Sequence, residues 1–94
     1  MSDFKSIGEL FDSEPGLKKT RKLLEEGEVL YYFYIIFPQF INIAEPVKVE
    51  KKNLYLRVEN AAWRSELKFR EDELIKTIND YFSGERIKHL KFII

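Results

Sequence analysis

The spacing of apolar residues changes twice in the second half of the chain, and this change constrains the fold more than any other feature. In residues 46–51 and 54–59 apolar side chains stand at every second position, as in a strand with one buried face. The short connection from Lys51 to Asn53 makes the two segments an antiparallel hairpin. We therefore expect two half-buried strands with one face of the hairpin in the core.

Residues 60–82 follow a helical spacing instead, and Asn60 is a good N-cap for this segment. Phe69 falls on the opposite side from the other apolar residues. This indicates either a break near Arg70 and Glu71 or a contact of Phe69 with another element. We favour the break, with a second helix that starts at residues 71–73, where negative charge suits a helix N-terminus. The remaining apolar residues lie within an arc of about 120° that we expect to pack on the sheet. They are Trp63, Leu67, Leu74, Ile75, Ile78, Tyr81 and Phe82.

Alternation resumes in residues 86–94, after Ser83 and Gly84 end the helix. The segment between the hairpin and this last strand is long enough for a crossover. The expected fold class is α+β, with N-terminal helices followed by an αββαβ order and a three-stranded sheet covered by helices on one face. The length of 94 residues predicts a single domain over residues 1–94.

The N-terminal part carries helical patterns. Residues 2–11 suit a short amphipathic helix, and residues 12–16 form a turn because they combine proline with glycine. A second helix is expected over residues 17–26, with Gly27 as a left-handed C-cap. Its buried residues would be Leu17, Leu23 and Leu24.

Residues 28–37 are crowded with aromatic and branched side chains, and two secondary structures suit them. Their propensity allows a strand. We favour a buried helix, because Pro38 begins a second helical piece that runs to Ala44. A core helix is favoured over an exposed aromatic binding surface.

Catalytic and metal chemistry has little support in the sequence. The absence of cysteine excludes disulfides, thiolate zinc sites and cysteine nucleophiles. His89 has no acidic neighbour in the sequence, and the consecutive carboxylates of residues 71–73 diverge on a helix. The glycines are isolated and none begins a phosphate-binding loop. We expect a protein that is not an enzyme and that holds no cofactor or metal.

The N-terminus lacks the pattern of a signal peptide, and the most apolar run falls short of the roughly 20 residues that cross a bilayer. A cytoplasmic location without membrane contact is the expectation.

The remaining candidate for function is a basic surface with aromatic members. The formal net charge is zero, which argues against a strong, sequence-independent polyanion binder, but the net charge is minus three over residues 1–46 and plus three over residues 47–94. Lysine and arginine bind phosphates and an exposed tyrosine can stack a base. Interleaved glutamates make ordinary solvated positions the alternative. The candidate residues are Lys48, Lys51, Lys52, Tyr55, Arg57, Arg64, Lys68 and Arg70.

The second half of the chain also resembles the DciA-like family of bacterial proteins. The pattern is a strand at residues 54–58, a helix start at Ala62 and Trp63, a leucine four residues later, a leucine-rich segment that ends at Asn79, a glycine, and a final strand at residues 87–93. Upstream, Pro46 matches the proline before the hairpin, and the N-terminal helices carry Ile7, Leu10, Leu17 and Leu23 in suitable places.

This resemblance implies a KH-like fold without a GXXG loop and a role in replication initiation. DciA proteins bind the replicative helicase DnaB and assist its loading onto single-stranded DNA, and they are not ATPases. The expected function is a non-enzymatic replication accessory that contacts the helicase and weakly binds nucleic acid. Two alternatives remain open, an RNA-binding KH-like module and a self-association domain built on the aromatic segment at residues 31–40.

Overall fold

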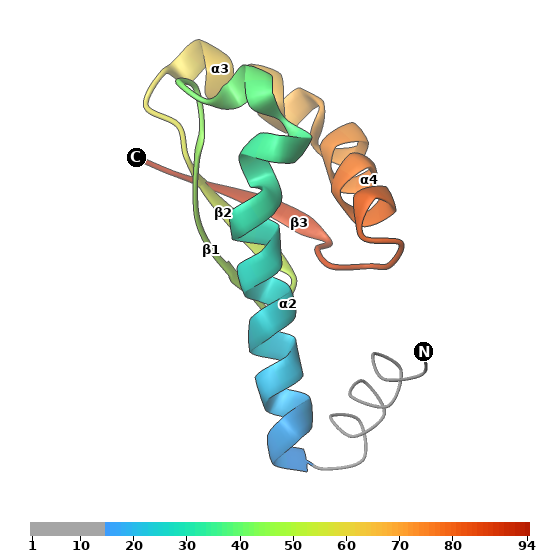
Figure 1. Ribbon diagram of the computed structural model, residues 1–94. Coiled ribbons are helices and arrows are strands. Elements are labelled where there is room, and N and C mark those ends of the chain that lie inside the picture. The colour runs from blue at the N-terminus through green and yellow to red at the C-terminus, as the bar shows by residue number, and fades with distance from the viewer. Residues whose placement is uncertain (1–14) are drawn as a thin grey trace.

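The computed structural model describes residues 15–94, so the helix expected at residues 2–11 lies outside the described residues. Its elements follow the expected order of helix, two strands, helical crossover and strand, which confirms the α+β prediction (Figure 1). They are α2 (Pro15–Ile36), the 3-10 helix η1 (Pro38–Phe40), β1 (Glu45–Glu50), β2 (Asn53–Arg57), α3 (Ala61–Phe69), α4 (Glu71–Tyr81) and β3 (His89–Ile93).

The three strands form one mixed sheet in the order β1-β2-β3. β1 and β2 are antiparallel, whereas β2 and β3 are parallel. The parallel pairing arises because α3 and α4 carry the chain back to the end of the sheet at which β2 begins. The turn of the hairpin consists of Lys51 and Lys52, which both have positive φ, at 51° and 64°. A two-residue turn of this kind matches the twist of the flanking strands, although Asn and Gly are its usual residues.

α2 is one continuous helix, so the C-cap predicted at Gly27 is wrong, as is the strand alternative for residues 28–37. Gly27 has no positive φ, because an interior glycine costs only about 1 kcal/mol and the helix continues through it to reach the core. Leu23 and Leu24 were expected to be buried but are 61% and 56% exposed. They lie in the N-terminal half of α2, which projects beyond the sheet in Figure 1.

The core lies between the C-terminal half of α2, one face of the sheet and the crossover helices. Val29 and Phe33 of α2, and Phe37 directly after it, are at most 5% exposed, which confirms the predicted core helix. The sheet contributes Val49, Leu54, Leu56 and Leu90, while Leu67, Leu74 and Ile78 come from α3 and α4. The helix expected from Pro38 to Ala44 is shorter than predicted, with η1 followed by a turn.

The break between α3 and α4 lies at Arg70, as predicted, and Asn60 caps α3 by accepting a hydrogen bond of 3.0 Å from the Trp63 backbone N–H. The prediction that the whole apolar arc is buried is wrong in part. Trp63 is 38% exposed and Tyr81 is 49% exposed, because both lie where their helices extend past the core. Phe69, on the side opposite the arc, is 88% exposed, so the alternative of a contact with another element is not found among residues 15–94.

Glu71 is the first residue of α4, where an acidic side chain is favourable and was expected. Its side chain also bonds to the last strand. Its carboxylate accepts a hydrogen bond of 2.9 Å from the backbone N–H of Leu90 and lies 3.0 Å from the Lys68 ammonium. The Leu90 N–H, and then Lys68, lower the pKa of Glu71. Glu71 therefore joins the α3–α4 corner to β3.

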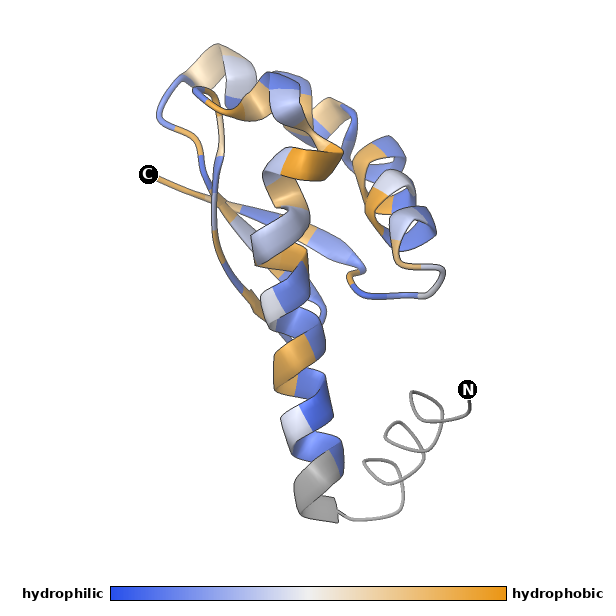
Figure 2. Cartoon of the chain, in the orientation of Figure 1, coloured by the Kyte–Doolittle hydropathy of each residue, from blue (hydrophilic) through white to orange (hydrophobic). Residues whose placement is uncertain are grey.

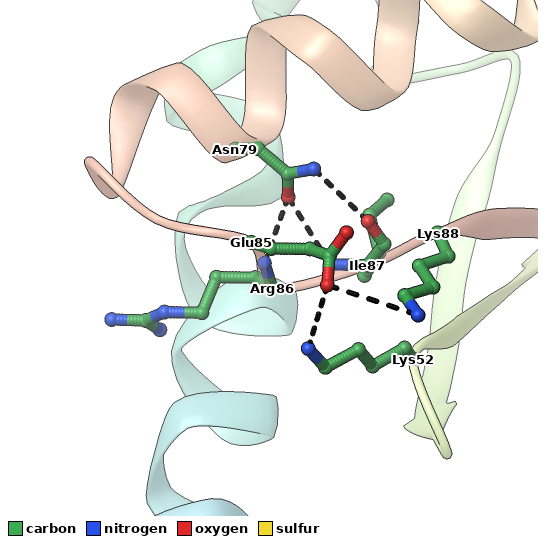
Figure 3. Close-up of polar contacts among 6 residues, drawn as sticks. All are labelled: Lys52, Asn79, Glu85, Arg86, Ile87 and Lys88. Carbon is green, nitrogen blue, oxygen red and sulfur yellow. Dashed lines mark hydrogen bonds and ion pairs between the residues drawn. The ribbon is translucent and has the colours of Figure 1, made fainter.

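Asn79 of α4 holds the loop that leads into β3 (Figure 3). Its side-chain oxygen accepts from the backbone N–H groups of Arg86 at 2.9 Å and Ile87 at 3.1 Å, and its side-chain nitrogen donates to the Ile87 carbonyl at 3.0 Å. The chain is thus held in a loop up to Lys88, and β3 starts at His89, three residues later than the strand predicted from residue 86.

Candidate functional site

The face of the sheet opposite the core carries an aromatic ring between two lysines. The strand register places Tyr55 of β2 directly beside Lys48 of β1 on one side and Lys91 of β3 on the other. The Lys48 ammonium lies 4.7 Å from the centre of the Tyr55 ring. Neighbouring strands are about 4.8 Å apart, so the three side chains form a compact row across the sheet. We call Lys48, Tyr55 and Lys91 the sheet row.

Lys91 was missed by the sequence analysis, although it stands between the inward-facing Leu90 and Phe92 and so had to face outward. Its place beside Tyr55 depends on the parallel pairing of β2 with β3, which sequence spacing does not reveal. Among residues 15–94, no ion pair is found for Lys91, and its side chain is exposed. It is therefore an available cation on this face.

Arg57 lies on the same face, two residues after Tyr55 in β2. Its guanidinium is 2.9 Å from the Glu45 carboxylate. Lys48 is 3.6 Å from Glu50. These pairs have side chains between 41% and 60% exposed, and exposed pairs of this kind contribute only about 0–1 kcal/mol. A phosphate can replace either glutamate at little cost.

The hairpin turn brings Lys51 and Lys52 to one end of the sheet. Lys52 is engaged with Glu85, at 2.8 Å, and Lys88 lies 4.0 Å from the same carboxylate (Figure 3). The hydrogen bond from Lys52, followed by its charge, lowers the pKa of Glu85. Much of the positive charge at this end is therefore balanced within the chain.

The three predicted cations of the crossover lie beyond the other end of β2, so the structure does not gather all eight candidates into one patch. Arg64 donates to the carbonyls of Val58 at 2.6 Å and Glu59 at 2.9 Å, and it thereby ties the start of α3 to the end of β2. Lys68 pairs with Glu71, and Arg70 pairs with Glu66 at 2.7 Å.

Two adjacent shallow grooves meet at Trp63, between the start of α3 and the turn after η1. Their volumes are about 510 and 550 Å³, and both are lined by Ile43, Asn60 and Trp63. Tyr34 forms part of the first groove and donates a hydrogen bond of 2.7 Å to the Ala44 carbonyl. Burial, and then the charge of Glu45, raise the pKa of Tyr34. This neutral hydroxyl holds one wall of the groove in place.

The second groove combines apolar surface with charge, since Phe40, Glu66 and Arg70 lie along it. From the sequence, Trp63 was predicted to be a core residue, but it is partly exposed. Helical periodicity shows which residues share a face of the helix, but not where along the helix that face extends past the core. The partly exposed indole at the junction of two grooves is suited to a protein contact, since tryptophan often supplies much of the binding energy in such contacts.

The part of the chain from residue 15 onward contains no group of three or more His, Asp or Glu side chains that could hold a metal ion. Across the same residues, no helix is both long and apolar enough to cross a membrane. The geometry that is present favours binding through the sheet row and the Trp63 grooves.

Comparison with protein-family models matches residues 6–92 to the family described as Dna[CI] antecedent, DciA. No curated protein gives a match to the chain. The matched range includes the hairpin, both crossover helices and nearly all of β3.

Proposed function

Because the chain belongs to the DciA family, which implies a helicase-loader role in bacterial DNA replication, we propose that it binds the replicative helicase and assists its loading onto single-stranded DNA. The family match over residues 6–92 is the observation that carries this proposal. The family is associated with the helicase DnaB. We assign the helicase contact to the Trp63 grooves and the nucleic-acid contact to the sheet row.

The helicase contact is proposed at the Trp63 grooves. The indole is partly exposed and lies beside the apolar residues Phe40 and Ile43 of the second groove. Glu66 and Arg70 of the same groove pair with each other. A helicase side chain that enters the groove would bury apolar surface at its centre and meet charges at its edge, which is the usual anatomy of a protein interface.

Replacing Trp63 with alanine should weaken the helicase complex by more than about tenfold, because a buried interface tryptophan commonly contributes upward of 2 kcal/mol. Phe69→Ala is the matched control, since Phe69 lies on the same helix, is 88% exposed and lines neither groove. Mass photometry of the cognate helicase with each variant provides the measurement. Circular dichroism checks that each variant is folded.

The outcomes separate the proposed function from the proposed site. If the unmodified chain forms no complex with the cognate helicase at micromolar concentrations, the proposed function is wrong. If the complex forms and Trp63→Ala binds as tightly as Phe69→Ala, the function stands and the contact lies elsewhere.

Weak binding of single-stranded DNA is proposed at the sheet row. A base can stack on Tyr55 while Lys48 and Lys91 contact the phosphates on either side, an arrangement that does not read sequence. Arg57 lies next along β2 and can extend the basic track. The predicted contributions of Arg64, Lys68 and Arg70 are not included, because these residues lie in α3 and at its C-terminal end, beyond the end of β2 and away from the sheet row.

Two substitutions in the sheet row should have different signatures. Lys91→Ala should reduce the slope of log affinity against log salt by about 0.7, since one phosphate contact is lost. Tyr55→Ala should weaken binding by roughly 1–3 kcal/mol with an unchanged slope, because stacking releases no counterions. Fluorescence anisotropy with a labelled oligonucleotide at several salt concentrations measures both.

Lys76→Ala is the control for charge alone, because Lys76 lies on α4 and pairs with Asp80 at 2.6 Å, away from the sheet. An unchanged slope in Lys91→Ala would remove the sheet row from consideration. Preference for structured RNA over single-stranded DNA, together with no helicase complex, would favour the RNA-binding alternative.

A further inference from the structure

A further groove lies between the N-terminal half of α2 and the hairpin, and Trp63 takes no part in it. Its volume is about 390 Å³. Its apolar residues are Leu23 of α2, which is 61% exposed, and Val49 of β1, which is 7% exposed. The other residues that line it are all charged, and we call the whole the hairpin groove. They are Lys19, Lys22, Glu26, Lys48, Glu50 and Lys51.

Helical spacing explains why the α2 members of the hairpin groove lie together. Lys19, Lys22 and Glu26 stand three and four residues apart, so they are neighbours along one face of the helix. Hydrophilic residues make up most of the described N-terminal half of α2, with one apolar stretch among them (Figure 2). The groove therefore combines charged side chains with a small apolar surface.

The charges of the hairpin groove favour an anion. Four lysines and two glutamates line it, which gives a net charge of plus two. Among residues 15–94, no ion pair is found for Lys19, Lys22 or Lys51. Lys48 does lie 3.6 Å from Glu50, but both side chains are more than half exposed, and such a pair contributes little. At least three of the four lysines are thus available to a ligand.

Lys48 makes the hairpin groove continuous with the sheet row, because it belongs to both. β1 is an edge strand, so no other strand separates the open face of the sheet from the groove. Lys51 follows three residues after Lys48, in the turn of the hairpin. A path of positive charge therefore runs from Tyr55 around the edge of β1 to Lys22 on α2.

We propose that the hairpin groove binds the phosphates of the same DNA single strand whose base stacks on Tyr55, with Lys19 and Lys22 as the additional contacts. This inference rests on the nucleic-acid contact proposed at the sheet row and extends it. Lysines spread over a turn of α2 and along β1 suit a chain of phosphates better than a single ion. Phosphate contacts position a strand without reading its sequence.

Continuity with the sheet row is also the reason to choose nucleic acid over an acidic peptide. A peptide would use the charges of the groove but would have no need of Tyr55 beside it. A single strand uses both, since bases stack on aromatic rings while lysines along the groove follow the backbone. The exposed Leu23 side chain adds an apolar surface for a sugar or a base.

Glu26 opposes the proposed contact and so provides a test with the opposite sign. Its side chain is half-buried in the hairpin groove, and no ion pair is found for it within the described part of the chain. A phosphate held by Lys22 would lie near this like charge. Glu26→Gln should therefore strengthen binding of a long strand about two- to fivefold. A variant that merely misfolds would bind more weakly, not more tightly.

Fluorescence anisotropy with two labelled thymidine oligonucleotides tests the proposal on the full chain. One of about four nucleotides can occupy the sheet row alone, whereas one of about twelve can also reach the hairpin groove. The longer one should bind more tightly and with a steeper salt dependence. Lys19→Ala and Lys22→Ala should each reduce its slope of log affinity against log salt by about 0.7. The slope of the shorter one should not change.

Arg21→Ala is the matched control, because it removes one positive charge from the same turn of α2. Arg21 does not line the hairpin groove, and it points about 100° or more away from each α2 residue that does. Its partner is Glu25, at 3.4 Å. This variant should leave both slopes unchanged. Circular dichroism checks that every variant is folded.

The outcomes separate the hairpin groove from the sheet row. If neither oligonucleotide binds the unmodified chain, both surfaces are wrong. If the short one binds through Tyr55 but the long one has the same slope and does not respond to Lys22→Ala, the sheet row stands and the groove is wrong. If Lys22→Ala weakens only the helicase complex, the groove binds protein and the proposal is wrong. An affinity that fails to rise in Glu26→Gln would also overturn it.

Discussion

Replacing Phe33 with alanine is expected to lower the free energy of unfolding by about 3–5 kcal/mol. Phe33 is 2% exposed, and its ring centre lies 5.4 Å from that of Phe37 and 6.4 Å from that of Phe40. The substitution removes apolar surface from the centre of the core and leaves a cavity between α2 and η1. Relaxation can fill little of it, because Phe37 and Phe40 are themselves packed, at 5.3 Å between ring centres.

Phe69→Ala is the control, because it makes the same phenylalanine-to-alanine change at an exposed position. It should change the free energy of unfolding by less than about 0.5 kcal/mol, since Phe69 is 88% exposed. Urea denaturation followed by circular dichroism measures both variants. Since the total stability of a domain this small is on the order of 5–15 kcal/mol, Phe33→Ala can fail to fold. Phe33→Leu, which retains most of the volume, should then show a smaller loss. Equal stability of Phe33→Ala and Phe69→Ala would contradict the assignment of α2 to the core.

Replacing Asn79 with alanine is expected to lower the free energy of unfolding by roughly 2–3 kcal/mol, a large effect for a side chain that adds nothing to the apolar core. Three hydrogen bonds of 2.9–3.1 Å are lost at once, and the backbone groups of Arg86 and Ile87 lose their partners. Ile87 is completely buried, so water cannot easily replace the missing bonds there. The loop before β3 should therefore open more readily.

The adjacent substitution Asp80→Ala is the matched control, because Asp80 is exposed and pairs with Lys76 across one helical turn. It should cost less than about 0.5 kcal/mol. Thermal unfolding should show a midpoint for Asn79→Ala roughly 10–20 °C lower, since each kcal/mol corresponds to several degrees in a domain of this size. Faster hydrogen exchange at the Ile87 amide would locate the effect. An unchanged midpoint and unchanged exchange would show that Asn79 does not hold the loop.

The elements of the second half of the chain were predictable because their signals are local. Alternation in the hairpin, the N-cap at Asn60 and the reversal of side at Phe69 each depend on residues within a few positions of one another. The helix break at Arg70 follows from the same spacing. In α2 the local signal misled, because Gly27 is typical of a helix end but lies inside a helix held in place by Val29 and Phe33.

The candidate surfaces were predictable only in part. Strand alternation places Lys48, Tyr55 and Arg57 outward, but their neighbour Lys91 is identified only when β3 pairs with β2. Trp63 shares a helical face with buried Leu67, and helical spacing alone does not distinguish them. Their exposure differs because Leu67 lies over the core, whereas Trp63 lies at the start of α3 beside the two grooves.

The sequence by itself determined the order and type of the elements from residue 45 onward, the side of each strand that enters the core, and the resemblance that the family match confirms. These properties follow from backbone periodicity, which acts over a few residues. Only the tertiary structure decided which side chains meet and which remain exposed. Exposure depends on the elements that lie opposite a residue, and for Tyr31, Trp63 and Lys91 those elements are far away in the sequence or absent from the described chain.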